Sequence, residues 1–283
     1  MRLKQTESSS DPFQDNQHLL RRQTWIVAAL TLVAVTTMLL PLKQIFIPPP
    51  YYLPLHTLLE FVSVLFAFLV FAAVWHTPEK EVSTSLLLIA VALFASGWLD
   101  LAHALSYKGM PDLITPSGVE KGIAFWLSAR LIVAVTLLFS SALPRLRAPR
   151  KWERISLLAG YTLVNIVVFW LIIFHERSLM PTFAAASGVT LFKTSAESAI
   201  TLLLILAAWR YYRLARRSKN AFLPLMFSAV AIAAISEFFF TDYQLTSDAA
   251  NALGHLCKLA SYGLIYRAMF VVTIRKPYQE LAA

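Results

Sequence analysis

Apolar runs of about 20 residues alternate with short polar segments along most of the chain. A membrane-spanning helix needs about 20 apolar residues, because each residue rises 1.5 Å and the hydrocarbon core is about 30 Å thick. The runs stop at clusters of proline or charge such as "IPPPYYLP" and "LPRLRAPRKWER". The pattern predicts eight helical spans, at about 24–46, 55–75, 83–105, 122–143, 154–175, 193–212, 221–241 and 252–274.

The composition supports an all-α, polytopic integral membrane protein. Of 283 residues, 58% are hydrophobic and only 14% charged, whereas soluble proteins average about 25% charged. Little sequence remains outside the spans, so a soluble catalytic domain is excluded. No G-x-S-x-G, H-E-x-x-H or glycine-rich phosphate loop occurs. We therefore expect no enzyme, and the single cysteine, Cys257, excludes an internal disulfide and a multi-cysteine metal site.

The predicted domain organisation is simple. A polar head at 1–23 precedes an eight-helix membrane domain at 24–274, and 275–283 forms an exit segment. Basic residues fix the expected orientation, because cytoplasmic loops carry an excess of Lys and Arg. One set of loops holds 17 of them and the other set 5, with Lys121 and Lys193 counted in the second set. We therefore expect both termini in the cytoplasm, and we attribute the net charge of +9 to topology and anionic lipid, not to nucleic acid.

With that orientation, ionisable residues from six spans fall in the outer half of the membrane domain. They are His56, Glu60, Asp100, His103, Arg130, Glu197, Glu237, His255 and Lys258. A charge inside the membrane costs about 2.5–3.5 kcal/mol, so such residues usually face the bundle interior and pair with one another. The predicted spans should therefore converge on one polar site.

The charges and residue types in this set suggest what the site could bind. Arg130 lies roughly 12 Å below the outer end of its span, which is too deep for easy contact with water, so it needs an acid partner. Four acids and two bases sum to −2, which suits a cation or protonated histidines. His56, His103 and His255 are candidate ligands of a metal ion or a proton-sensing group, because imidazole is the commonest metal ligand and titrates near neutrality.

Other interpretations of the same residues stay open. A purely structural polar network could lock the bundle, and single histidines near helix ends, such as His76 and His175, are usually interfacial. Haem b held by two of the histidines, in a redox or transport protein, is the alternative from a different class. A secondary transporter would need acids along its whole path, and the inner half has none. Six tryptophans, Trp126 among them, are interpreted as anchors at the membrane surface.

The segments that carry these residues resemble the third class of membrane-associated sensor (MASE) domains of bacteria. The segments are "HTLLEF", "DLAHALSYKGMP", "WLSARL", "KTSAES", "SEFFFTDY", "GHLCKLASYGLIYRA" and "PYQEL", and they run from about Leu55 to Leu281. Each motif is weak alone, but their order and their expected side of the bilayer are specific.

The resemblance implies a sensory input module of the bacterial inner membrane. Members usually continue at the C-terminus into diguanylate cyclase (GGDEF), PAS or histidine-kinase output domains. This sequence stops at Ala283, directly after the last motif, so we expect a free-standing sensor or a part of a longer chain. We expect the signal to bind the polar site and to act on a cytoplasmic partner through the last span, since His255 and Lys258 lie on it. The signal and the oligomeric state stay open, and a homodimer is compatible with the sequence.

Overall fold

The computed structural model describes residues 12–39, 45–143, 148–184, 188–241 and 248–275. The described chain is built from eight long helices: α1 (Pro12–Leu39), α2 (Pro49–His76), α3 (Thr84–Leu105), α4 (Val119–Ala142), α5 (Lys151–Phe174), α6 (Leu191–Ala215), α7 (Phe222–Phe240) and α8 (Ala249–Phe270). Short elements join them: the 3₁₀ turns η2 (Glu79–Glu81) and η3 (Glu176–Ser178), and the strand pair β1 (Phe183–Ala184) and β2 (Gly188–Val189). The fold is all-α, as predicted, apart from these two-residue strands.

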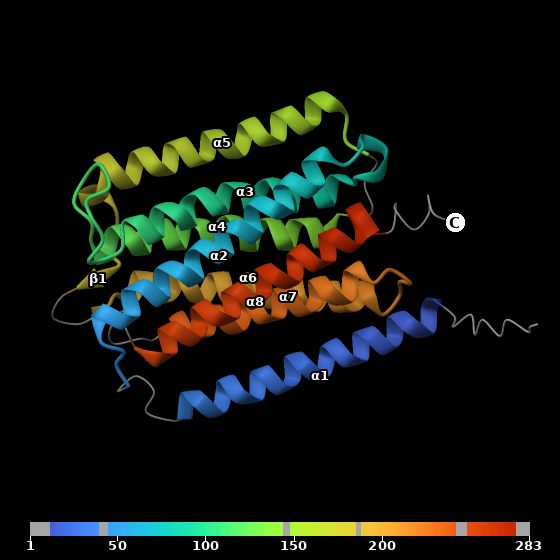
Figure 1. The fold of residues 1–283 in the computed structure, drawn as a ribbon, viewed down its shortest axis with the longest axis horizontal. Coiled ribbons are helices and arrows are strands. Elements are labelled where there is room, and N and C mark those ends of the chain that lie inside the picture. The colour runs from blue at the N-terminus through green and yellow to red at the C-terminus, as the bar shows by residue number, and fades with distance from the viewer. Residues whose placement is uncertain (1–11, 40–44, 144–147, 185–187, 242–247, 276–283) are drawn as a thin grey trace, which may run out of the picture.

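The eight helices run side by side along the long axis and alternate in direction (Figure 1). The start of α1 and the end of α8 lie at one end of the bundle, and the α3–α4 loop lies at the other. We call the second end the α3–α4 end. Each of the eight has a segment long and apolar enough to cross a membrane. The chain is therefore a multi-pass membrane protein with eight candidate spans.

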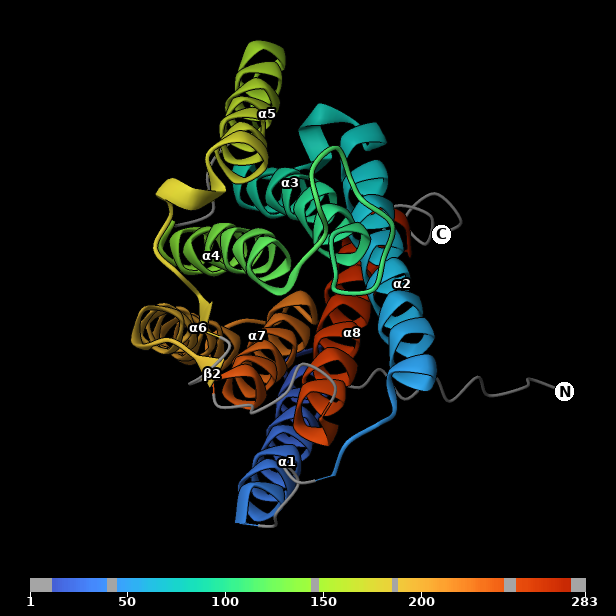
Figure 2. The same cartoon turned by 90° about the vertical axis from the view of Figure 1, so that its left-hand side faces the viewer.

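The end-on view shows which helices are central (Figure 2). α1 and α5 lie at opposite edges, whereas α7 and α8 pack together in the middle. Hydroxyl groups link these two central helices, because Ser236 donates to the carbonyl of Gly254 and Ser261 to that of Ala229, both at 2.8 Å. Small and hydroxyl side chains let membrane helices approach closely and bond across their interface. α8 is therefore tied to α7 by hydrogen bonds at two positions as well as by packing.

Seven of the predicted spans overlap their helices closely, and the first is displaced. α1 begins at Pro12, not near residue 24, so 12–23 of the predicted polar head is helical. Asn16 and Gln23 are buried there, and Gln23 accepts a hydrogen bond from Ser228 of α7. Hydropathy alone missed these roughly three turns of helix, because polar side chains such as Asn16 and Gln23 form hydrogen bonds within the protein. The predicted end at residue 46 is also wrong, since Phe46 lies in an isolated bridge with Asp248.

The last helix changes geometry at its C-terminal end. α8 continues as the π-helical segment η4 (Val271–Arg275). π-Helical turns are rare and frequently occur at functional positions. The helix that leaves the bundle thus ends in an irregular turn.

Candidate functional site

All nine ionisable residues that the sequence places in the site are buried, with 0–6% of their surface exposed. They lie in the halves of six helices nearer the α3–α4 end: His56 and Glu60 from α2, Asp100 and His103 from α3, Arg130 from α4, Glu197 from α6, Glu237 from α7, and His255 and Lys258 from α8. Helical spacing explains why α2, α3 and α8 each contribute two of these residues, since residues three or four apart share a face of a helix. Seven of the nine form one connected network, which is described first.

Lys258 of α8 joins two carboxylates that belong to different helices. Its ammonium nitrogen lies 2.6 Å from Oε2 of Glu60 on α2 and 3.1 Å from Oδ1 of Asp100 on α3. A buried charge is tolerated only when it is paired and hydrogen-bonded. α8 is thus tied to two neighbouring helices by one side chain.

The acid partner that Arg130 needs is Asp100. One guanidinium nitrogen lies 2.8 Å from Oδ1 and 2.6 Å from Oδ2 of this carboxylate. The same nitrogen donates to the hydroxyls of Tyr262, at 2.7 Å, and Ser96, at 3.2 Å. These contacts link α4 to α3 and α8, so the charged network spans four helices.

Trp126 lies at the centre of the site and is not a surface anchor. It is buried, and its ring lies 4.7 Å from the Arg130 guanidinium carbon and 4.6 Å from the Lys258 nitrogen. Its ring also lies 5.4 Å from those of His103 and His255. A tryptophan face attracts cations in such positions. The prediction of a membrane-surface role for Trp126 is therefore wrong.

The three histidines lie together beside the charged network. Nε2 of His56 lies 3.2 Å from Nε2 of His103. Nδ1 of His103 donates to the carbonyl of Gly122 at 2.8 Å, and Nδ1 of His255 donates to Oε1 of Glu60 at 2.7 Å. One donor atom from each of these histidines and one from Glu60 all lie within 4.8 Å of one another. This group is the histidine cluster (His56, Glu60, His103, His255), and it has the residue types and spacing of a metal site.

Aromatic rings and a small cavity border the histidine cluster. The ring of Tyr107, just past α3, lies 4.1 Å from that of His56, and the ring of Tyr52 stacks on His56 at 5.9 Å. A cavity of about 30 Å³ is lined by His103, His255 and Trp126, among others. A space of this size holds one water molecule or ion.

Lys193, Glu197 and Glu237 form a second polar group on α6 and α7. The Lys193 ammonium lies 2.6 Å from Oε2 of Glu197 and donates to the carbonyl of Phe240. Oε2 of Glu237 is buried with no hydrogen-bond partner among the described residues. Lys193 was assigned to a loop, but it is buried in the first turn of α6. With its charge included, the formal sum of the site is −1 and not −2.

Ser96, Trp126 and Tyr262 are site residues that sequence reasoning missed. Each lies four residues from a charged residue that was identified: Asp100, Arg130 and Lys258, respectively. A side chain one turn away shares the same helix face. That spacing could have placed all three in the site.

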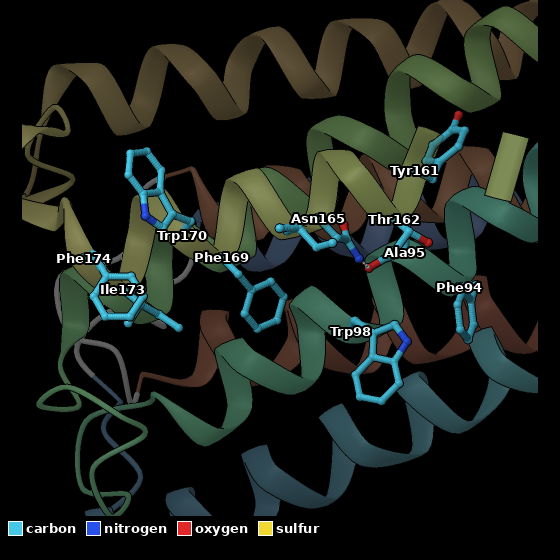
Figure 3. A pocket seen from close by; sticks show the side chains of 11 residues that line it. Phe94, Ala95, Trp98, Tyr161, Thr162, Asn165, Phe169, Trp170, Ile173 and Phe174 are labelled. Carbon is cyan, nitrogen blue, oxygen red and sulfur yellow. Dashed lines mark hydrogen bonds between the residues drawn. The ribbon is translucent and has the colours of Figure 1, made fainter. Parts of the chain in front are cut away.

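A much larger cavity lies away from the charged network. It measures about 570 Å³ and lies between α3 and α5. Figure 3 shows aromatic side chains such as Phe94, Trp98 and Phe169 around it, with Asn165 on its wall. The Asn165 amide donates to the carbonyl of Ala95 at 2.9 Å. An apolar cavity beside a helix at the edge of the bundle suits lipid chains. The charged network therefore remains the candidate functional site.

The sequence was compared with protein families, curated proteins and solved structures. The model of the MASE3 membrane-associated sensor domain matches residues 47–277, which are most of the chain and all six helices that carry the site. No curated protein and no solved structure matches. The match and the eight candidate spans together show that the chain belongs to the MASE3 family of membrane-associated sensor domains.

Proposed function

We propose that this domain is a sensory input module of the bacterial inner membrane that receives its signal at the α3–α4 end. The observation that carries the proposal is the buried network around Lys258, in which α8 is paired with acids of α2 and α3. Buried charges are costly, and replacing them by apolar residues often stabilises a protein. A network of this extent in a membrane sensor domain therefore supports a functional role.

The basic residues of the loops support a periplasmic position for this site. The start of α1 and the end of α8 lie at the same end of the bundle (Figure 1). By the positive-inside rule, that end faces the cytoplasm and the α3–α4 end faces the periplasm. The signal would then come from the periplasm or from the outer leaflet of the membrane.

α8 is the proposed route from the site to the output. His255, Lys258 and Tyr262 lie on it and contact side chains of α2, α3 and α4. A ligand shifts a two-state equilibrium only through its different affinity for the two states. Contacts between helices that move relative to one another meet this requirement. The cytoplasmic end of α8, with its π-helical turn, would act on a GGDEF, PAS or histidine-kinase partner.

A chimera tests this function. A diguanylate cyclase domain fused after Arg275 should give an output that Asp100→Asn and His255→Gln change at equal protein levels. Tyr211→Phe is the matched control, because the Tyr211 hydroxyl is buried and bonded to Ser140 at 2.9 Å outside the site. If the site variants and the control leave the output equally unchanged, the polar network is structural and the proposal fails.

The haem alternative fits the geometry less well. Two histidines that hold a haem face each other across a porphyrin, which needs a wide flat space around their ring nitrogens. The cavity that borders His103 and His255 measures only about 30 Å³, which is too small for a porphyrin. Acidic side chains also surround the imidazole rings, and such side chains are unusual in a dry haem pocket.

A further inference from the structure

We propose that the histidine cluster binds a first-row transition-metal dication, for which Zn²⁺ fits best. The binding site follows from geometry alone, whereas its role as the signal rests on the proposed function. The donor set is three imidazoles and one carboxylate, contributed by three helices. Zinc binds such nitrogen and oxygen donors, usually four in a tetrahedron.

The distances within the histidine cluster are close to those of a bound tetrahedral ion. Metal–ligand bonds of about 2.0–2.1 Å place neighbouring ligand atoms roughly 3.3–3.4 Å apart. The Nε2 atoms of His56 and His103 are 3.2 Å apart, and Nδ1 of His255 and Oε1 of Glu60 are 2.7 Å apart. The four donor atoms all lie within 4.8 Å of one another. An ion at the centre therefore requires side-chain rotations that bring the two pairs closer together.

Backbone contacts prepare His103 as a ligand. Its Nδ1–H donates to the carbonyl of Gly122, so Nε2 of the neutral ring carries a lone pair and points toward His56. Metal-bound histidines commonly have their other ring nitrogen fixed in this way, which sets the tautomer and the ring orientation. Nδ1 of His56 is buried with no hydrogen-bond partner among the described residues, so the metal-free cluster leaves one imidazole nitrogen unsatisfied.

Glu60 connects ion binding to the charged network. One of its oxygens accepts from His255, and the other pairs with Lys258. An ion between His255 and Glu60 takes the place of the proton on Nδ1 of His255. That proton moves to Nε2 of the same ring, so the imidazole stays neutral and Nδ1 supplies the lone pair. The ion also attracts the Glu60 carboxylate and repels Lys258, so Lys258 depends more on Asp100, which is 3.1 Å away. Binding would thus shift the balance of an α8 contact from α2 toward α3.

Metal binding to the purified full chain tests the proposal. The protein, carrying a tag free of histidine, is treated with a chelator and titrated with Zn²⁺ and with Co²⁺. We expect one equivalent of each by elemental analysis, and the visible absorption of tetrahedral Co²⁺. Cobalt should also quench the fluorescence of Trp126, whose ring lies 5.4 Å from two of the three histidine rings. The quenching that is lost in a Trp126→Phe variant is the part that comes from Trp126.

Matched variants locate the site. His56→Ala and His103→Gln should each weaken zinc binding by more than about 10-fold, because even partners of the ligands contribute 10–100-fold. His175→Ala should bind as wild type, since His175 lies outside the site at the end of α5. Helical content and melting temperature show that each variant is folded. Absence of stoichiometric binding, or equal losses in His103→Gln and His175→Ala, overturns the metal site. If the protein binds no metal but the output of the cyclase chimera still changes in the site variants, the metal proposal fails and the proposed sensory function stands.

Discussion

The ammonium nitrogen of Lys258 on α8 lies 2.6 Å from a carboxylate oxygen of Glu60 on α2. This single contact joins the helix that leaves the bundle to the helix that supplies two members of the histidine cluster. Because both side chains are buried, loss of this pairing leaves a buried charge with fewer partners. An event that alters the charge at Glu60 therefore acts directly on a contact of α8.

Arg130→Ala should destabilise the bundle strongly. The substitution leaves Asp100 with a reduced set of partners in a buried site, and breaking a buried pair costs about 3–5 kcal/mol. Arg267→Ala is the control, because Arg267 is exposed near the C-terminal end of α8. Its long side chain can reach the membrane surface there, so it needs no buried partner. Thermal melting in detergent compares the two variants, and equal shifts would contradict the buried pairing.

Reporter fusions should place both termini in the cytoplasm. Alkaline phosphatase is active only outside the cytoplasm, so a fusion after Arg275 should be inactive and a fusion after Pro116 active. The physical reason is the excess of basic residues in the loops at the end where α8 leaves the bundle. Activity after Arg275 would reverse the orientation and would place the site on the cytoplasmic side.

Glu60→Gln should weaken zinc binding by at least about 10-fold while the chain stays folded. The amide keeps the size of the side chain but loses the charge that faces His255 and Lys258. Glu120→Gln, at an exposed position in the first turn of α4, should have no effect. Calorimetric titration measures both, and unchanged affinity in Glu60→Gln would remove this carboxylate from the ligand set.

Gly254→Ala should disturb the site through packing alone. A β-carbon at this position would lie 2.4 Å from the ring of Phe240, which itself packs against Trp126 and His255. Overpacking of this kind costs about 1–3 kcal/mol. Gly263→Ala on the same helix is the control, since its nearest neighbour would be 3.8 Å away in the ring of Phe66. Melting and tryptophan fluorescence should change only in the first variant.

Much of the fold and of the site's membership could be predicted from the sequence, because hydropathy and helical spacing are local properties. The eight apolar runs define the helices, and the spacing of Asp100 and His103 places them on one face of α3. The N-terminal part of α1, residues 12–23, could not be predicted in this way. Asn16 is buried there because it bonds to backbone carbonyls at and just after the end of α6, a contact between distant segments.

The pairing within the site also depends on contacts between helices. Four acids were candidates for Arg130, and only the packing of α3 against α4 selects Asp100. Lys121 and Lys193 were counted as loop residues, whereas both are buried in the first turns of helices and donate to backbone carbonyls. The order of residues in the sequence shows neither the burial of these lysines nor the contact of Trp126 with two cations.

The central claim is that ion binding at the histidine cluster moves α8 relative to α2. Spin labels are placed at two exposed positions, Glu79→Cys in η2 just after α2 and Arg275→Cys in η4 just after α8, in a Cys257→Ser background. They report the separation of α2 and α8 at the end of the bundle opposite the site. Zinc at one equivalent should shift the distance distribution by about 1–2 Å or more, the size of helix shifts in allosteric transitions, and His103→Ala should abolish the shift. An unchanged distribution in protein that holds one equivalent of zinc would contradict the account.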